Sequence, residues 1–346
     1  MFTRQYIGGK GAILMLVGML VVALAVPAWG AYKAEYKMSV RTTQTSPWGA
    51  GAQKFADIVK EKSNGNINIK IYFNGSLFAD DQTKEFMLTK QGVADFALGS
   101  TINWSPQLRV LNLFTLPFMF PSYEALDAVK YGNAGKMIKQ QMDKFGVIFL
   151  GWGENGYREL TNSLRPIATP DDIKGLKVRA AASPIFIDTF NAMGANPVLM
   201  NWGDALSALQ QGTIDAQENP VNVIIIPYKI FQLHKYITVW HYAIDPLILG
   251  VSKMTWDTFS AADKRMMLQA AEEAMKWEMR EAREGLTRDG ASYKKLEAEG
   301  MTVTYLTPDQ IKVFQDRSKP VYDKWTKEIG EDVVKAAFAD VAKVTK

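Results

Sequence analysis

Gly175-Leu-Lys-Val-Arg179 begins the most informative segment of this sequence, and Asp215-Ala-Gln-Glu-Asn-Pro220 ends it, with Gly194-Ala-Asn-Pro197 and Asn201-Trp-Gly-Asp204 between them. Arg179 ends an apolar, strand-like step, and Asn219-Pro220 is typical of a pair that opens a helix. Both positions lie where a strand is expected to end, which is where open α/β sheets bind ligands. Because the guanidinium fork of arginine matches a carboxylate, the stretch indicates a site for an organic acid.

Hydrophobic periodicity predicts two α/β units around this stretch. In the first unit we expect strands at 36–40, 67–71, 94–98 and 147–152, with helices at 48–63, 81–91 and 123–144. In the second we expect strands at 177–179, 213–217 and 236–240, with helices at 184–193 and 204–211. The apolar segment 247–252 matches the first unit, so the chain is expected to cross back there. Residues 261–300 are helical almost throughout, with a bend expected at Gly285 or Gly290.

These patterns predict an α/β protein with two lobes that close like a clamshell on a ligand. Each lobe is expected to be a mixed sheet flanked by helices, and a long helix is expected to span the lobes. The predicted division is a signal peptide at 1–30, a first lobe at 31–155 plus 245–284, and a second lobe at 156–244 plus 285–346.

The amino terminus has the features of a secretory signal peptide. Arg4 and Lys10 precede sixteen uncharged residues, 11–26, and the small residues Ala28 and Gly30 follow. A membrane anchor is the alternative, but a spanning helix needs about 20 apolar residues. We expect cleavage after Gly30, with cleavage after Ala28 as the alternative.

Composition excludes several classes of function. The chain has no cysteine, so it has no disulfide framework and no cysteine to carry a lipid anchor. An exported, untethered protein is retained only behind an outer barrier, which predicts a periplasmic location. Removing residues 1–30 leaves 38 basic against 36 acidic residues (40 − 2 and 36), a balance that predicts no nucleic-acid partner.

A search for catalytic and metal-binding motifs is negative. The chain has no Gly-x-Ser-x-Gly elbow and no P-loop, and its two histidines, His234 and His241, lack zinc-ligand spacing. We therefore predict no catalytic residue, no metal and no cofactor.

The motifs between Gly175 and Pro220 resemble those of the DctP-type substrate-binding proteins of TRAP transporters, and the resemblance extends from about Tyr36 to past Gly300. It implies the periplasmic-binding-protein fold. It also implies that Arg179 makes the paired contact with the substrate carboxylate and that Arg158, in Gly156-Tyr-Arg-Glu-Leu-Thr-Asn162, lies close by. The remaining ligand contacts that it implies are Asn219 as a hydrogen-bonding residue, Trp202 as an aromatic cover and Arg41 as a polar contact. This chain has Ala216 where the family commonly has glycine, which suggests that no positive φ is needed there.

Each of these residues also has a purely structural interpretation. Arg179 would pair with Asp171 or Asp172, Arg158 would pair with Glu159, Asn219 would cap a helix, and Trp202 would belong to the core. Trp48, Trp104 and Trp152 lie near expected strand ends and are further candidates for lining the cleft.

The resemblance implies a monomeric periplasmic receptor that captures a small organic carboxylate and delivers it to a TRAP-type membrane permease. A periplasmic enzyme acting on organic acids and a tethered sensory module are the alternatives. Sugar acids, keto acids, aromatic acids and dicarboxylates remain open as ligands.

Overall fold

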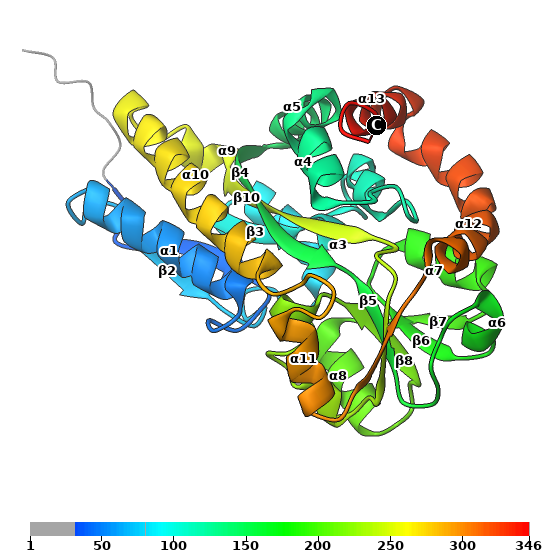
Figure 1. Ribbon diagram of the computed structural model, residues 1–346. Helices are drawn as coiled ribbons and strands as arrows, with labels where there is room; N and C mark the ends of the chain where they lie inside the picture. Colours follow the sequence, from blue (N-terminus) through cyan, green and yellow to red (C-terminus); the bar gives the residue numbers. More distant parts are fainter. Residues whose placement is uncertain (1–31, 80, 346) are drawn as a thin grey trace, which may run out of the picture.

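The computed structural model describes residues 32–79 and 81–345, so the predicted signal peptide lies outside the described residues. Two mixed β-sheets form the framework, with helices packed around them (Figure 1). This confirms the predicted two-lobed α/β fold. Among residues 32–79 and 81–345, no helix has both the length and the apolar character needed to cross a membrane.

The first sheet has the strand order β2-β1-β3-β10-β4. Its strands are β1 (Tyr36–Val40), β2 (Ile69–Tyr72), β3 (Phe96–Ser100), β4 (Val147–Tyr157) and β10 (Ile244–Ser252). Strands β1, β2 and β3 are parallel, whereas β10 runs antiparallel to both β3 and β4. The chain therefore returns to the first sheet at β10, as predicted.

The second sheet has the order β11-β9-β5-β8-β6-β7. Its strands are β5 (Glu159–Asn162), β6 (Lys177–Ala180), β7 (Asn196–Leu199), β8 (Ala216–Asn219), β9 (Tyr236–Val239) and β11 (Thr302–Tyr305). Strand β6 is parallel to β7 and β8, so the carboxyl ends of β6 and β8 lie at the same edge. This parallel pairing brings together the two ends of the segment from Gly175 to Pro220.

Two extended connections join the sheets side by side. Strand β4 ends at Tyr157 and β5 begins at Glu159, while the return from β9 to β10 pairs Ile244 with Tyr157. The backbone N–H of Arg158 donates to Ala243 O at 3.0 Å across this crossing. Arg158 therefore lies where the chain passes from one sheet to the other.

Helices cover both sheets. Before β6 these are α1 (Pro47–Lys62), α2 (Glu85–Lys90), α3 (Thr101–Trp104), α4 (Tyr123–Tyr131), α5 (Asn133–Phe145) and α6 (Pro170–Ile173), with short helices at Gln82–Lys84 (η1) and Arg109–Thr115 (η2). After β6 come α7 (Pro184–Ala192), α8 (Trp202–Gln210), η3 (Val221–Ile225), η4 (Ile230–Gln232), α9 (Lys253–Trp256), α10 (Ala261–Arg283), α11 (Ala291–Ala298), α12 (Pro308–Ile329) and α13 (Glu331–Val341). The long helix α10 packs along α1 and β4 and also contacts η3.

Glycines set the breaks in two predicted helices. The expected helix 123–144 divides into α4 and α5 at Gly132, where a Cβ atom would lie 2.3 Å from Ala128 O. The expected helix 261–300 stops at Arg283 and resumes at Ala291. Gly285, with φ of +69°, lies in the gap, so the chain breaks there rather than bending.

The lobe boundaries stay a prediction. Helix α13, which the prediction places in the second lobe, packs against α4 and α5 of the first-lobe segment, and α12 packs against α7.

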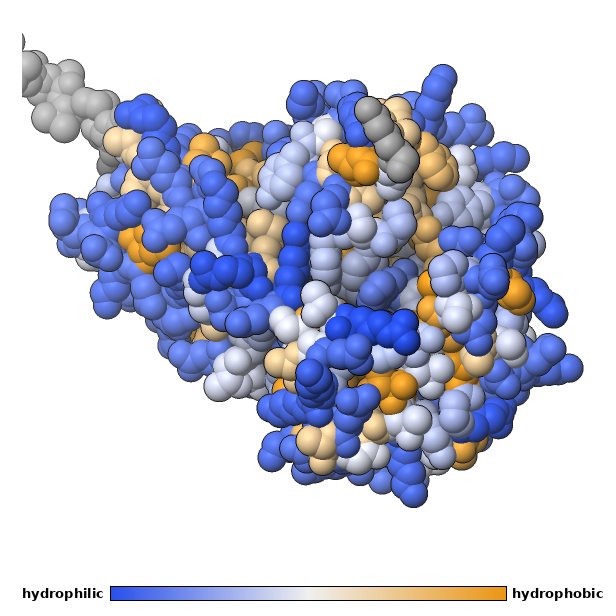
Figure 2. Space-filling model, viewed as in Figure 1, coloured by the Kyte–Doolittle hydropathy of each residue, from blue (hydrophilic) through white to orange (hydrophobic). Residues whose placement is uncertain are grey.

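On the face shown in Figure 2, hydrophilic side chains dominate and hydrophobic ones are scattered. Scattered exposed hydrophobic residues are ordinary for a folded domain.

Candidate ligand-binding site

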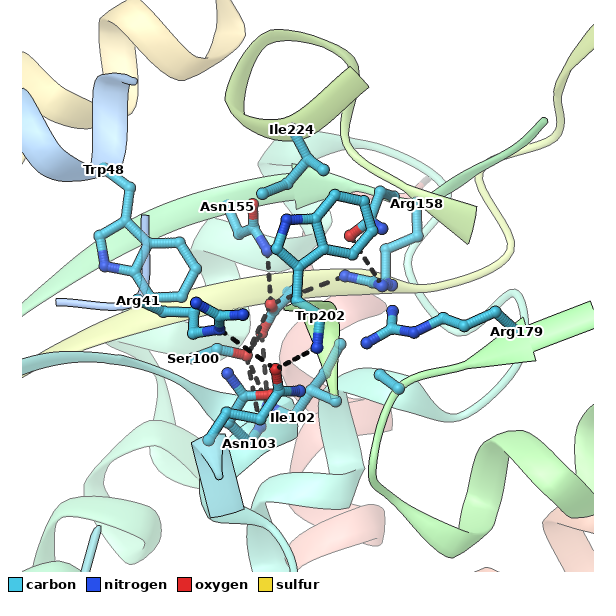
Figure 3. Close-up of a pocket in the computed structure, with 14 residues that line it drawn as sticks. Arg41, Trp48, Ser100, Ile102, Asn103, Asn155, Arg158, Arg179, Trp202 and Ile224 are labelled. Atoms are coloured by element: carbon cyan, nitrogen blue, oxygen red, sulfur yellow. Dashed lines mark hydrogen bonds and ion pairs between the residues drawn. The ribbon is translucent and has the colours of Figure 1, made fainter. Parts of the chain in front are cut away.

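One pocket brings together all five residues predicted to bind ligand (Figure 3). Arg41 follows β1, Arg158 lies at the crossing, Arg179 is in β6, Trp202 begins α8 and Asn219 ends β8. Each of the five is at most 6% exposed. The complete lining is Arg41, Trp48, Gln82, Ser100, Ile102, Asn103, Asn155, Arg158, Arg179, Ala181, Trp202, Asn219, Ile224 and Asp245.

Arg179 is a buried cation without an acidic partner. Its Nε and Nη2 donate to Met200 O at 3.2 and 2.8 Å, and its guanidinium carbon lies 5.4 Å from the centre of the Trp202 ring. Among residues 32–79 and 81–345, no carboxylate forms an ion pair with it. The structural alternative, in which Arg179 pairs with Asp171 or Asp172, is therefore wrong. The Asp172 carboxylate instead caps α6 through Thr169.

The pKa of Arg179 falls to about 10, chiefly because burial disfavours the charged form. The Glu218 carboxylate opposes this shift, while the positive charges of Arg158 and Arg41 add to it. Arg179 is still cationic at neutral pH, so the pocket holds a positive charge that is desolvated and uncompensated.

Arg158, in contrast, is paired. Its Nη2 donates to Glu218 Oε1 at 2.8 Å and to Glu218 O at 2.7 Å, and its Nε contacts the same carboxylate. Burial lowers the pKa of Arg158, but the charge of Glu218 outweighs it and the net shift is upward. The predicted alternative partner, Glu159, is wrong: its carboxylate instead contacts His241 and accepts from Trp240 N.

Asn219 is a strand residue and does not cap a helix. It pairs with Glu159 in the β5–β8 ladder, so β8 continues to its end and Pro220 becomes the residue before η3. Its Oδ1 accepts from Arg158 Nη2 at 3.1 Å, and its Nδ2 donates to Gln217 Oε1 at 2.6 Å. Ala216 lies within the same strand and is absent from the described residues with positive φ, as expected.

Polar residues that the sequence reasoning missed form the base of the pocket. Asp245 accepts from Ser100 Oγ at 2.7 Å, Thr101 Oγ1 at 2.9 Å and Asn155 Nδ2 at 2.8 Å. Its carboxylate also lies 3.9 Å from Arg158 Nη1. The only available signal was that Ser100 and Asp245 adjoin apolar strands; their meeting depends on β10 pairing with β3.

Gln82 connects the two halves of the pocket. Its Oε1 accepts from Arg41 Nε at 3.4 Å and from the backbone N–H of Trp202 at 3.3 Å, while its Nε2 donates to Asn103 Oδ1 at 2.8 Å. Gln82 comes from η1 beside the first sheet, and Trp202 begins α8 beside the second. The structure therefore represents a closed arrangement around the pocket.

Of the three other tryptophans that were candidates for lining the cleft, one lines the pocket and two do not. Trp48 lines the pocket and donates from Nε1 to Leu98 O at 2.7 Å. Trp104 and Trp152 do not line it; their indole N–H groups donate to Glu85 and to Lys130 O. In the part of the chain that the structure describes, no cluster of three or more His, Cys, Asp or Glu side chains could hold a metal ion.

Similarity to known proteins extends over most of the chain. The family model for DctP, bacterial extracellular solute-binding protein family 7, matches residues 38–328. A TRAP periplasmic solute-binding protein from Ralstonia eutropha, solved with (S)-2-hydroxy-2-methyl-3-oxobutanoate, is 49% identical, with a TM-score of 0.88 over 90% of this chain and 100% of that one.

More distant relatives have different ligands. A TRAP periplasmic solute-binding protein from Sulfurospirillum deleyianum, solved with succinate, is 29% identical, with a TM-score of 0.80 over 88% of this chain and 98% of that one. The 2,3-diketo-L-gulonate-binding periplasmic protein of Escherichia coli strain K12 is 31% identical over 69% of this chain and 72% of that protein. The model match and these relatives together show that the chain belongs to the DctP family of bacterial extracellular solute-binding proteins.

Proposed function

We propose that this protein is the periplasmic receptor of a TRAP-type transporter, and that it captures a small organic carboxylate and delivers it to the membrane permease. The observation that carries the proposal is the buried Arg179 guanidinium, which has no ion-pair partner among the described residues. An uncompensated buried charge is costly, and a ligand carboxylate would supply the missing counter-ion.

The neighbouring groups would direct where that carboxylate binds. Met200 O holds the Arg179 Nε and Nη2 edge, and Trp202 packs against its face. The remaining nitrogen, Nη1, is free to donate to a carboxylate, and Nη2 can share in a two-point contact. Asn219 lies beside Arg158 and would hydrogen-bond the same ligand.

Ligand binding would stabilise the closed lobes. The pocket takes Arg41, Gln82 and Asn155 from the first-sheet side, and Arg179 and Trp202 from the second. A ligand that touches both groups is released only when the lobes separate. In this proposal the closed form is the one that the permease recognises, and the signal peptide at residues 1–30 exports the chain.

The pocket gives little support to an enzyme. A reaction on the bound acid would need a base or a nucleophile that is free to act. Asp245 accepts hydrogen bonds from Ser100, Thr101 and Asn155, and Glu218 is held by Arg158 and Tyr242.

A thermal-shift screen of organic acids tests the receptor function. The first acid to test is (S)-2-hydroxy-2-methyl-3-oxobutanoate, because the 49% identical relative was solved with it. A true ligand should raise the melting temperature with the logarithm of its concentration above the dissociation constant. If sugar, keto, hydroxy, aromatic and dicarboxylic acids all leave the melting temperature unchanged, the proposal is wrong.

A further inference from the structure

Two buried polar atoms in the pocket have no hydrogen-bond partner among residues 32–79 and 81–345. Asn155 Oδ1 and Trp202 Nε1 both lack one, although their side chains line the pocket and the residues are only 4% and 5% exposed. Leaving a buried donor or acceptor unsatisfied is unfavourable, and such groups are uncommon in folded proteins. We therefore expect a ligand to supply the missing hydrogen-bond partners of both atoms.

Chemistry and surroundings fix whether each atom donates or accepts a hydrogen bond. Asn155 Nδ2 donates to the Asp245 carboxylate at 2.8 Å, so the amide cannot be reversed and Oδ1 is an acceptor. An indole N–H can only donate. The centre of the Trp202 ring lies 5.4 Å from the Arg179 guanidinium carbon and 5.3 Å from the centre of the Tyr228 ring, and the backbone N–H of Trp202 donates to Gln82. The ligand must therefore donate to Asn155 and accept from Trp202.

The charges of the pocket limit the ligand to one carboxylate. Of the three arginines in the lining, Arg158 is paired with Glu218 and Arg41 is engaged with Gln82 and by a further interaction. Within the described residues Arg179 forms no ion pair: it donates to the backbone oxygen of Met200 and packs against the ring of Trp202. When Glu218 and Asp245 are counted against the three arginines, one positive charge remains, so a second ligand carboxylate would leave the pocket with a net negative charge.

The donor that meets Asn155 must be neutral. Three arginines but only one carboxylate, Asp245, line the pocket, so a ligand ammonium group would meet a net positive lining. A hydroxyl group can both donate and accept, which satisfies Asn155 Oδ1 and Trp202 Nε1 either alone or together with an adjacent carbonyl. Ile102, Ala181 and Ile224 leave apolar wall for a short carbon skeleton.

We infer that the ligand is a short hydroxylated monocarboxylate, with Asn155 and Trp202 as the residues that select its hydroxyl group. The inference rests on the proposed receptor function and narrows it. It also changes the role expected for Trp202: its indole N–H would read a polar group, in addition to the ring covering the ligand.

Calorimetry with matched acids tests the inference. The probes are 2-hydroxy-2-methylbutanoate, its deoxy analogue 2-methylbutanoate, its amino analogue 2-amino-2-methylbutanoate, and succinate. The hydroxy acid should bind at least about tenfold more tightly than each of the other three, because each of those leaves a buried group unpaired or adds an unmatched charge.

The variant Trp202→Phe keeps an aromatic ring and removes the donor. It should weaken the hydroxy acid at least about tenfold more than it weakens 2-methylbutanoate, so that the preference disappears. Trp256→Phe, in α9 outside the pocket, is the matched control and should keep the preference. Circular dichroism confirms that each variant is folded.

The outcomes separate the two claims. If acids bind through Arg179 but the hydroxy and deoxy acids bind equally, or Trp202→Phe weakens both equally, the hydroxyl inference is wrong and the receptor function stands. If no carboxylate binds the wild-type protein, both are wrong.

Discussion

Arg158 and Glu218 form a buried ion pair, with Arg158 Nη2 2.8 Å from Glu218 Oε1, and this pair accounts for why Arg179 is the cation left over. Glu218 belongs to β8 and Arg158 to the crossing between the sheets, so the pair also fastens the crossing to the second sheet. Tyr242 donates a third hydrogen bond to the carboxylate at 2.9 Å. The Glu218 carboxylate is thereby used within the protein, which leaves Arg179 as the cation for the proposed ligand carboxylate.

Glu218→Gln should destabilise the fold. It leaves the Arg158 charge buried without its counter-ion, which we expect to lower the free energy of unfolding by about 3 kcal/mol. Urea denaturation of the unliganded protein measures this. Glu272→Gln, which removes an exposed pair with Lys276, is the control and should cost under about 1 kcal/mol. A loss equal to that of the control would show that the buried pair contributes little.

Gln82→Ala should weaken ligand binding through faster dissociation. The side chain joins Arg41 to the backbone of Trp202, so its loss removes a contact that holds the lobes closed. We expect about a tenfold rise in the dissociation rate, measured by stopped-flow tryptophan fluorescence. Gln53→Ala alters an exposed contact with Asp57 and is the control. An unchanged dissociation rate in Gln82→Ala would mean that Gln82 does not contribute to closure.

His234 should make the protein sensitive to acid. Its Nδ1 lies 2.9 Å from Thr161 Oγ1, which also accepts from Gln217 Nε2, so the hydroxyl hydrogen is directed at an unprotonated Nδ1. Burial lowers the pKa of His234 to about 4 from an ordinary 6.5. Between these pH values the unfolded chain binds a proton that the folded chain does not. His234 therefore contributes to the loss of stability as pH falls from 6.5 to 4, by about 3 kcal/mol.

Comparison of the wild-type protein with His234→Gln isolates the contribution of His234 to the pH dependence of the unfolding free energy. Unfolding free energies at pH 7, 6, 5 and 4 should decrease less steeply in the variant, because glutamine does not titrate. Parallel curves for the two proteins would contradict the assignment of a low pKa to His234.

Strand ends were the most predictable part of the site. Arg41 follows β1, Arg179 is the next-to-last residue of β6 and Asn219 ends β8, and the parallel pairing of β6 with β8 brings the last two to the same edge. Local periodicity was less informative for β8, which was expected at 213–217 and lies at Ala216–Asn219. Its residues Gln217, Glu218 and Asn219 are polar although buried. Their side chains form hydrogen bonds inside the protein: Gln217 with Thr161, Glu218 with Arg158, and Asn219 with Gln217.

The base of the pocket could not be predicted from local patterns. Asp245 meets Ser100 and Asn155 only because β10 inserts between β3 and β4, in a register that pairs Leu247 with Ser100. That insertion joins residues about 145 positions apart. The partner of Arg158 was missed for a related reason: Glu159 is adjacent in sequence, but its carboxylate contacts His241 and Trp240 N, and the actual partner, Glu218, comes from β8.

Calorimetric titration of wild type, Arg179→Ala and Arg179→Lys with the acid that gives the largest thermal shift measures what Arg179 contributes to carboxylate binding. Arg317→Ala, an exposed arginine in α12, is the control. We predict a loss of affinity of at least about tenfold in Arg179→Ala, partial recovery in Arg179→Lys because an ammonium cannot make the two-point contact, and no change in the control. Wild-type affinity in a folded Arg179→Ala protein would contradict the account.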